Sequence, residues 1–247
     1  MANPRSLRNP PIKEALIDFR IATDSTIDAG RLEALRGLLP GYPAVEEKRQ
    51  FKAEVRVDKG EVLSPAVTDL GFNGLLFRTT DGTRLVQFRR DGFTLNQLGG
   101  YRNANELINE GLRLWGLYAD LVKPSAVTRV AFRYINSLSL PYKSGDSFGR
   151  FLTAPPPGPP DDRLKLVSSF LSRVVCHEED RVAAVTQKLE NSPLDLPTPV
   201  SLDIDVFVVR DVEPTATALT PILATLRDLK NRVFFALLTD EAIDLYV

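Results

Sequence analysis

Cysteine and histidine are almost absent from this sequence, whose 247 residues contain one of each, Cys176 and His177. A single cysteine cannot form an internal disulfide, which is consistent with a reducing cytoplasm. Multi-histidine metal sites and most zinc sites are excluded, so a bound metal would need oxygen ligands. If both residues lie on one strand, their side chains point to opposite faces, and a thiol nucleophile paired with an imidazole base is not expected.

The residues after the histidine favour a structural role for it. His177 is followed by Glu178, Glu179 and Asp180, an acidic run that predicts a hairpin turn and a solvent-exposed or structural imidazole. A Ser-His-Asp triad would have to use this one histidine. The sequence therefore predicts no catalytic residue and favours a protein that is not an enzyme.

Long apolar runs and an excess of one charge are missing too. No run reaches the roughly 20 apolar residues that cross a bilayer, and residues 1–5 lead into prolines instead of a signal-peptide core. We therefore predict a cytoplasmic protein without a membrane partner. The net charge is −1, from 31 basic and 32 acidic residues, so no overall field attracts nucleic acid and any such binding would be local.

Glycine-rich nucleotide motifs are also lacking. The sequence has no P-loop and no strand-linked Gly-x-Gly-x-x-Gly motif, so no nucleotide or other cofactor is predicted. Gly99 and Gly100 precede a predicted helix whose N-terminus could hold an anion. The alternative is simple helix initiation, because Asn103 is a suitable N-cap.

What is present is the composition of a folded protein, with 43% hydrophobic and 26% charged residues. Apolar and polar residues alternate at 14–21 as in a half-buried strand, and Asp81-Gly82 between two β-rich runs predicts a hairpin. The first half is predicted to contain a strand at 14–21, a short helix at 31–39, strands at 51–57, 74–80, 83–87 and 92–98, and a long helix at 103–122.

The second half repeats this order of elements. Phe19-Arg20 matches Phe132-Arg133 at an offset of 113 residues, although chance similarity of common dipeptides is the alternative. A stiff proline-rich connector, or a docking segment, is predicted at 155–160. The predicted elements are a strand at 129–140, a short helix at 147–152, strands at 166–176, 181–189 and 200–210, and a long helix at 217–238 that residues 240–247 extend.

These patterns predict an α+β fold, a curved antiparallel sheet with its helices on one face. Residues 1–123 and 124–247 would be tandem strand-helix-meander-helix repeats that form one continuous pseudo-symmetric domain. This order of elements is similar to that of TATA-binding-protein-like folds. The similarity concerns topology only and does not imply DNA binding.

Three segments resemble a sporadically distributed family of prokaryotic proteins of about this length. They are Asn-Pro-Pro-Ile-Lys-Glu-Ala at 9–15, Phe-Arg-Tyr-Ile-Asn at 132–136, and the closing helix at 229–238. The resemblance implies a cytoplasmic prokaryotic protein and supplies no catalytic residue.

Two sets of side chains on the predicted strands are candidates for a site. Asp203 and Asp205 share one strand face and could hold Mg²⁺ in a hydrolase or nuclease, or could be a solvated face neutralised by arginines. Arginines on the polar face of the sheet could bind phosphate or carboxylate, unless Asp18, Glu54 and the two aspartates pair with them. The tentative ligand-binding set is Arg20, Arg56, Arg78, Arg133, Asn136 and Arg173.

The leading functional hypothesis is a non-enzymatic binding or regulatory module. It would recognise a protein partner or a small anionic ligand through the open face of the sheet or through an exposed edge. The alternatives are the Mg²⁺-dependent hydrolase or nuclease and a nucleic-acid binder. Sheet edges that need covering make a homo-oligomer a further hypothesis.

Overall fold

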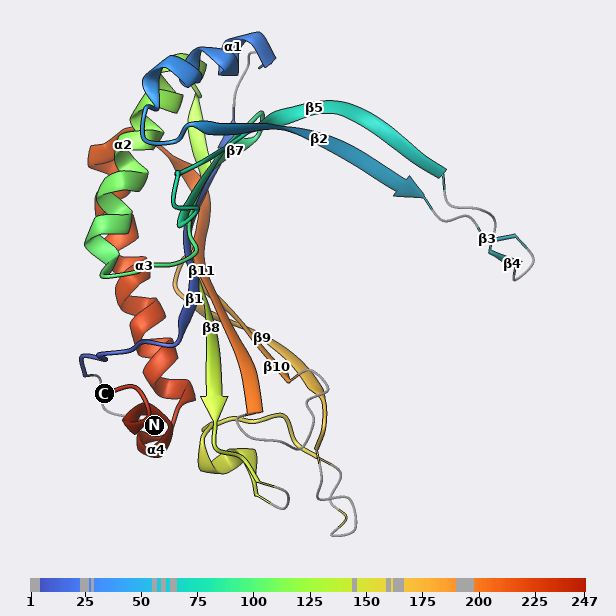
Figure 1. The fold of residues 1–247 in the computed structure, drawn as a ribbon, viewed down its shortest axis with the longest axis vertical. Coiled ribbons are helices and arrows are strands. Elements are labelled where there is room, and N and C mark those ends of the chain that lie inside the picture. The colour runs from blue at the N-terminus through green and yellow to red at the C-terminus, as the bar shows by residue number, and fades with distance from the viewer. Residues whose placement is uncertain are drawn as a thin grey trace.

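The computed structural model describes residues 5–22, 27, 29–54, 57–58, 61–62, 66–143, 146–158, 161, 167–189 and 198–247. The main sheet is antiparallel and open, and the helices cover one of its faces (Figure 1). The prediction of an α+β protein with a curved antiparallel sheet is confirmed. Its nine strands are β1 Ile12–Ala22, β2 Ala44–Glu54, β5 Ala66–Arg78, β6 Arg84–Arg89, β7 Gly92–Gln97, β8 Ala126–Leu140, β9 Phe170–Glu178, β10 Arg181–Leu189 and β11 Thr198–Val212.

The strand order across this sheet is β2-β5-β6-β7-β1-β8-β11-β10-β9. The central pair, β1 and β8, joins the beginning of the chain to its middle, with Ile17 opposite Phe132 and Phe19 opposite Val130. Two short strands, β3 (Val57–Asp58) and β4 (Glu61–Val62), form a separate pair.

Two long helices run across the covered face of the sheet, α2 (Ala104–Val122) and α3 (Ala216–Leu237). Helix α2 begins where the sequence predicts, because the side chain of Asn103 accepts a hydrogen bond from the backbone N–H of Glu106 at 3.0 Å. The short helices are α1 Ala29–Glu33, which continues as the 3₁₀ helix η1 Ala34–Leu38, then η2 Phe148–Arg150 and α4 Asp240–Asp244.

The prediction that residues 240–247 extend the last long helix is wrong. Leu238 leaves the helix in an extended conformation and forms a β-bridge with Leu152. Thr239 then caps α4, its hydroxyl accepting a hydrogen bond from the N–H of Ala242 at 3.3 Å. The β-bridge at Leu238 therefore separates α3 from α4, although the apolar periodicity alone predicts one continuous helix.

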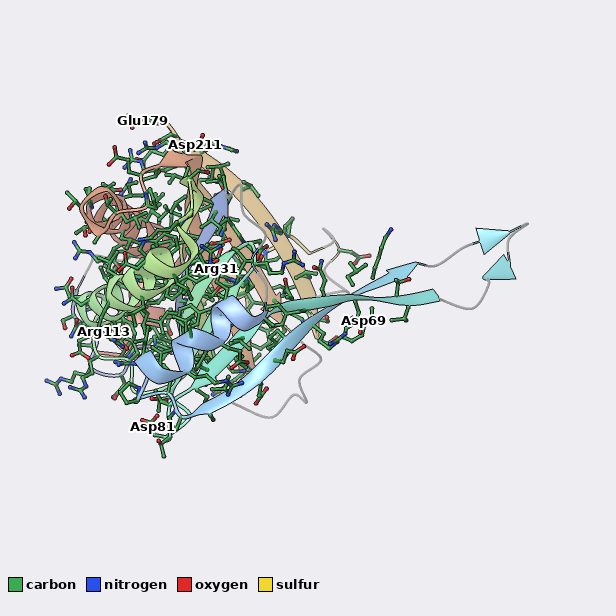
Figure 2. All side chains as sticks on the ribbon, turned by 90° about the horizontal axis from the view of Figure 1, so that it is seen from above. Arg31, Asp69, Asp81, Arg113, Glu179 and Asp211 are labelled. Carbon is green, nitrogen blue, oxygen red and sulfur yellow. The ribbon has the colours of Figure 1, made fainter. Side chains whose placement is uncertain are left out.

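Strands β2 and β5 extend beyond the body of the protein as a two-stranded arm (Figures 1 and 2). Arg49 pairs across the arm with Asp69 at 2.8 Å. The predicted strand at 51–57 overlaps only the outer part of β2, which already begins at Ala44. The first half of β2 is rich in charged residues, because both faces of the arm are solvated. The apolar alternation that marks a half-buried strand is therefore missing there.

The core lies between the sheet and the two long helices. Phe19 packs edge-on against Trp115, with ring centroids 5.1 Å apart, and Tyr118 donates a hydrogen bond to the backbone oxygen of Arg89 at 2.6 Å. The indole N–H of Trp115 reaches the carbonyl of Pro214 at 3.1 Å. The phenol of Tyr118 and the indole of Trp115 each have a hydrogen-bond partner, which offsets the cost of removing these polar groups from water.

Cys176 and His177 lie on β9, opposite Ala183 and Val182 of β10. Because neighbours on a strand alternate between faces, the thiol and the imidazole point apart, as expected from the sequence. Glu179 and Asp180 form the turn to β10, and Glu179 adopts a positive φ of 55°. The predicted acidic hairpin turn is thus confirmed. Across the described residues, we find no helix with the length and apolar character needed to span a membrane.

Candidate functional site

The predicted arginines share the open face of the sheet, but they lie far apart on it. Strand register places Arg20, Arg78, Arg133 and Arg173 on this face, from β5 near one edge to β9 at the other. Arg56 lies outside the described residues. The four side chains therefore share a face without forming one compact site.

The centre of the open face is a network of ion pairs around Asp18. This carboxylate is 7% exposed and accepts hydrogen bonds from Arg89 at 2.9 Å, Thr94 at 2.7 Å and Arg129 at 3.1 Å. Burial favours a raised pKa for Asp18, but Arg89, Thr94 and Arg20 outweigh it and hold that pKa below its usual value. The network neutralises the middle of the face.

Asp203 and Asp205 also face arginines. Arg133 holds Asp203 with two hydrogen bonds, and Arg129 donates to Asp205 at 2.8 Å. Burial raises the pKa of Asp205 although Arg129 opposes the shift. Within the described part of the chain, no group of three or more histidine, cysteine, aspartate or glutamate side chains is placed to hold a metal ion. Both carboxylates are therefore paired with arginines, as the neutralised-face alternative describes, but their side chains are only 20% and 23% exposed and so are less solvated than that alternative expects.

Two arginines of this network were not among the predicted residues. Arg129 bridges Asp18 and Asp205, and its guanidinium also lies 4.4 Å from the centre of the Phe207 ring. Its spacing of four from Arg133 on one strand puts both on the same face, a signal present in the sequence. Arg89 ends β6 and reaches Asp18 only because β7 lies beside β6 and β1 lies beside β7.

Asn136 lies on the other face of the sheet from Arg133, which corrects the expectation that the two act together. It is 2% exposed, lies opposite Leu202 and donates to the backbone oxygen of that residue at 3.0 Å. Asn136 instead lines a cavity on the helix-covered side. Sequence proximity was misleading here because an odd spacing on a strand reverses the face.

This second site, which we name the basic cavity, has a volume of about 320 Å³. Its walls come from the N-terminal segment before β1, the start of α2, the end of β8 and the second half of α3. Four cationic side chains and no acidic side chain of the described residues line it; the cations are Arg5, Arg102, Arg227 and Lys230.

Lys230 is the unusual member of this set. The residue is only 9% exposed, and its ammonium lies 3.9 Å from the centre of the Tyr134 ring. Among the described residues it has no acidic partner, whereas Arg5 pairs with Asp244 at 2.6 Å. Burial, helped by the Arg227 guanidinium, lowers the pKa of Lys230 to about 8. A cation–π contact alone is a weak substitute for the hydration that the ammonium loses.

Two tyrosine hydroxyls lie beside this lysine. The hydroxyls of Tyr101 and Tyr134 are 2.8 Å apart, and the rings meet edge to face with centroids 5.5 Å apart. Burial raises the pKa of both phenols, so both stay protonated and neutral near pH 7. Tyr101 lines the cavity, and the ring of Tyr134 contacts the ammonium of Lys230. A hydroxyl and an ammonium therefore lie in one compartment.

The charges of the remaining three cations are partly balanced outside the cavity. Arg102 is 3.9 Å from Glu106, and Arg227 contacts both Asp228 at 3.0 Å and Asn105 at 3.3 Å. These partners do not line the cavity. Lys230 is therefore the cation best placed to supply a free charge to a ligand.

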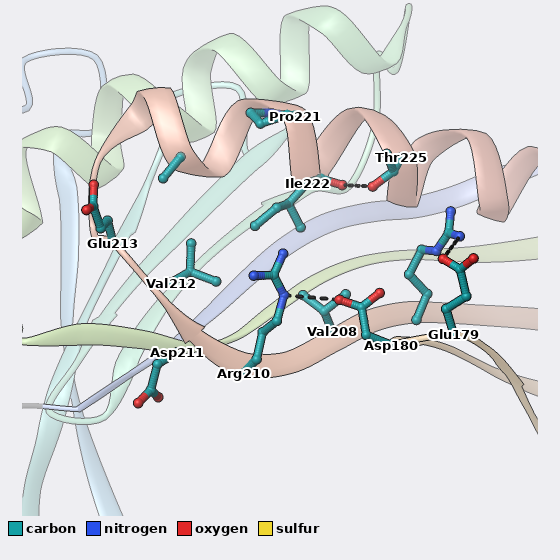
Figure 3. Close-up of a pocket in the computed structure, with 12 residues that line it drawn as sticks. Glu179, Asp180, Val208, Arg210, Asp211, Val212, Glu213, Pro221, Ile222 and Thr225 are labelled. Carbon is teal, nitrogen blue, oxygen red and sulfur yellow. Dashed lines mark hydrogen bonds and ion pairs between the residues drawn. The ribbon is translucent and has the colours of Figure 1, made fainter.

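A larger cavity of about 590 Å³ lies between the turn after β9, the end of β11 and the first half of α3 (Figure 3). Arg210 pairs there with Asp180 at 3.1 Å, and Arg181 pairs with Glu179 at 3.0 Å. Both of its arginines are thus satisfied by carboxylates of the same wall. It offers space but no uncompensated positive charge, so it is a weaker candidate for binding an anion.

Comparison of the sequence with protein-family models gives no match, and comparison with curated proteins gives none either. The site is therefore interpreted from its geometry.

Proposed function

We propose that this chain is a non-enzymatic binding module for a small anionic ligand, and that the ligand occupies the basic cavity. The observation that carries the proposal is Lys230, a buried ammonium without an acidic partner among the described residues. Burying an unpaired charge costs several kcal/mol, so such an arrangement is stable only if something offsets the loss of hydration. An anion in the cavity would do so.

The proposed ligand lies on the helix-covered side of the sheet. The charged side chains of the open face are instead assigned a structural role, because they pair with one another. Arg20, Arg89, Arg129 and Arg133 all contact carboxylates there. A phosphate or carboxylate would have to displace those carboxylates, whereas in the basic cavity it would meet Lys230 directly.

The segments that resemble the prokaryotic family support the same cavity. Its walls include Pro10, Pro11 and Ile12 from the first segment, Asn136 from the second, and residues 230–235 of the closing helix in part. Segments far apart in the sequence thus contribute to one compartment. We propose that their shared pattern is that of a ligand site.

The tandem-repeat topology is part of the proposal. The sequence equates Phe19 with Phe132, an offset of 113 residues, and a two-fold axis between two repeats would pass where a residue lies opposite its own counterpart. In the pairing of β1 with β8 that place is Asp18 opposite Ala131. The order outward from the centre, β1-β7-β6-β5-β2 and β8-β11-β10-β9, supports the same relationship for the first four strands of each half, and β2 is an additional edge strand of the first half.

Calorimetric titration with inorganic phosphate and with succinate tests the function, after native mass spectrometry of the purified chain for a retained ligand. Wild-type protein should bind one of these probes, and Lys230→Gln should weaken binding at least tenfold. Lys143→Gln is the matched control, because Lys143 is exposed and does not line the cavity. Equal affinities in all three proteins would refute the proposal.

The dependence of binding on pH provides a second test. Lys230 loses its charge near pH 8, so affinity for succinate, whose own charge is constant in this range, should fall as the pH rises from 7 to 9. Exposed lysines and arginines stay charged over that range. An affinity that does not change would exclude Lys230 as the main anion contact.

A further inference from the structure

Strand β9 forms one edge of the sheet and pairs, within the described residues, only with β10. The outer backbone N–H and C=O groups of an edge strand are available to another strand. Large apolar side chains are exposed on both faces of β9, with Leu171 70%, Val174 53% and Val175 47% exposed. The edge strand β9 therefore has exposed apolar side chains on both faces, and its outer backbone N–H and C=O groups face away from β10.

The opposite edge of the sheet is protected. The pairing of β2 with β5 shifts register between Lys48 and Arg49 and between Gln50 and Phe51, where Asn73 and Leu70 of β5 are the extra residues, and charged residues fill much of β2. Bulges and charges are the features that prevent edge-to-edge pairing. In contrast, β9 keeps an unbroken register against β10, and residues 174–176 read Val-Val-Cys. One edge of the same sheet is blocked and the other is not.

The charges of β9 suit a second copy of the same strand. Arg173 lies in its first half, and Glu178 and Glu179 lie at its end. In an antiparallel pair of identical strands, the first half of each lies against the second half of the other. Around an axis near Val175, each Arg173 would lie opposite His177 of the other strand, beside the acidic turn and away from the other Arg173, with the uncharged stretch at the centre.

We propose that β9 pairs with β9 of a second copy and extends the sheet across a two-fold homodimer. The two-fold axis passes near Val175, the middle of the uncharged stretch. Val174 and Val175, exposed in one copy, become partly covered in the dimer. Cys176, the one cysteine of the chain, lies next to this axis, so the two thiols come within about 10 Å of each other.

Sedimentation velocity over a range of concentrations, together with a short bis-maleimide cross-linker, tests this interface. Wild-type protein should be dimeric at micromolar concentration, and the cross-linker should produce one covalent dimer through Cys176. Val174→Lys should weaken the dimer at least tenfold and remove the cross-link, because an edge lysine blocks strand pairing. Val174 is exposed, so this substitution should leave the fold intact, as far-UV circular dichroism would show.

Val67→Lys is the matched control, since Val67 is 65% exposed but lies on the arm. It should remain dimeric with the same cross-linking yield as wild type. A monomeric wild type, a dimer that Val174→Lys does not affect, or a dimer that Val67→Lys dissociates would each overturn the proposal. Cys176→Ser should abolish the cross-link and keep the dimer, because the thiol reports the contact and does not form it.

Discussion

Arg133 of β8 forms a diagonal, two-pronged pair with Asp203 of β11, with Nε donating to Oδ1 at 2.8 Å and Nη2 donating to Oδ2 at 2.5 Å. This geometry holds the guanidinium in one orientation and uses two of its donors. Substitution can therefore distinguish two roles for Arg133. Loss of an ion-paired arginine lowers the stability of the protein, whereas loss of a ligand-binding arginine lowers the affinity for the anion.

We predict that Arg133→Gln and Asp203→Asn each destabilise the protein by about 1 kcal/mol, and that the double variant loses less than the sum. The arginine side chain is 39% exposed, so solvent keeps the coupling small. Urea unfolding of the four proteins measures it. Additive losses would mean that the pair does not couple in solution. Loss of anion binding in Arg133→Gln with unchanged stability would restore Arg133 as a ligand residue.

Replacing the buried lysine should stabilise the protein while it removes binding. Lys230→Met keeps the length of the side chain and discards the charge, so the free energy of unfolding at pH 7 should rise by roughly 3 kcal/mol, the equivalent of a pKa lowered from 10.5 to about 8. Thermal and urea unfolding measure the change. A less stable Lys230→Met would mean that the ammonium contributes favourably to the fold without any ligand.

The pH dependence of that difference has a defined sign. Between pH 8 and 10.5 the unfolded chain binds a proton that folded Lys230 has lost, so wild type gains stability as the pH rises. The advantage of Lys230→Met should therefore shrink across this window. Comparison with the variant cancels the opposite effect of the buried tyrosines, whose raised pKa values favour the unfolded chain at high pH.

Asp18→Asn should destabilise the protein by roughly 3 kcal/mol, because the buried Arg89 loses its buried carboxylate partner and keeps only the exposed Asp91. Folded Asp18 has a pKa below its ordinary value of 3.8, so its contribution is present above that pH and is lost as the pH falls through the folded pKa. Urea unfolding at pH 7 and pH 3 checks both points. The wild type and the variant should differ less at the lower pH.

Gly92→Ala should destabilise the sheet by more than about 3 kcal/mol, because Gly92 has φ +155° and an added Cβ would meet the backbone carbonyl of Phe19. Gly116→Ala is the control within α2. No atom lies within 4 Å of its added Cβ, and alanine is the better helix former by about 1 kcal/mol. Opposite shifts in melting temperature are expected, and equal losses would contradict this account.

Much of the sheet could be predicted from period-two alternation, since most strands have one face on the core. Strand β10 was predicted with its observed bounds, and the hairpins at Asp81-Gly82 and Glu179 followed from turn chemistry. The first half of β2 was missed because neither of its faces carries an apolar pattern. Apolar periodicity arises only where one face of a strand is buried, and neither face of this solvated arm is buried.

The basic cavity was harder to predict because it depends on how distant segments pack. Lys230 lies between Leu226 and Phe234 at four-residue spacing, so the helical period already placed it on the apolar side of α3. The sequence does not show that Tyr134 and the N-terminal segment enclose the ammonium. Ion pairing on the open face, by contrast, was one of the two alternatives stated for the arginines. Period-two alternation had already placed acidic and basic side chains on the same face of the predicted strands.

The position of β1 beside β8 also bears on how the chain is made. During synthesis β7, β6 and β5 emerge soon after β1 and can cover one of its sides, whereas its other side has no strand until β8 leaves the ribosome. A nascent chain that ends at α2 therefore exposes what will become the middle of the sheet. The pairing of β1 with β8 can begin as soon as β8 emerges, before β9, β10, β11 and α3 are made, and it ends this exposure of the central strand.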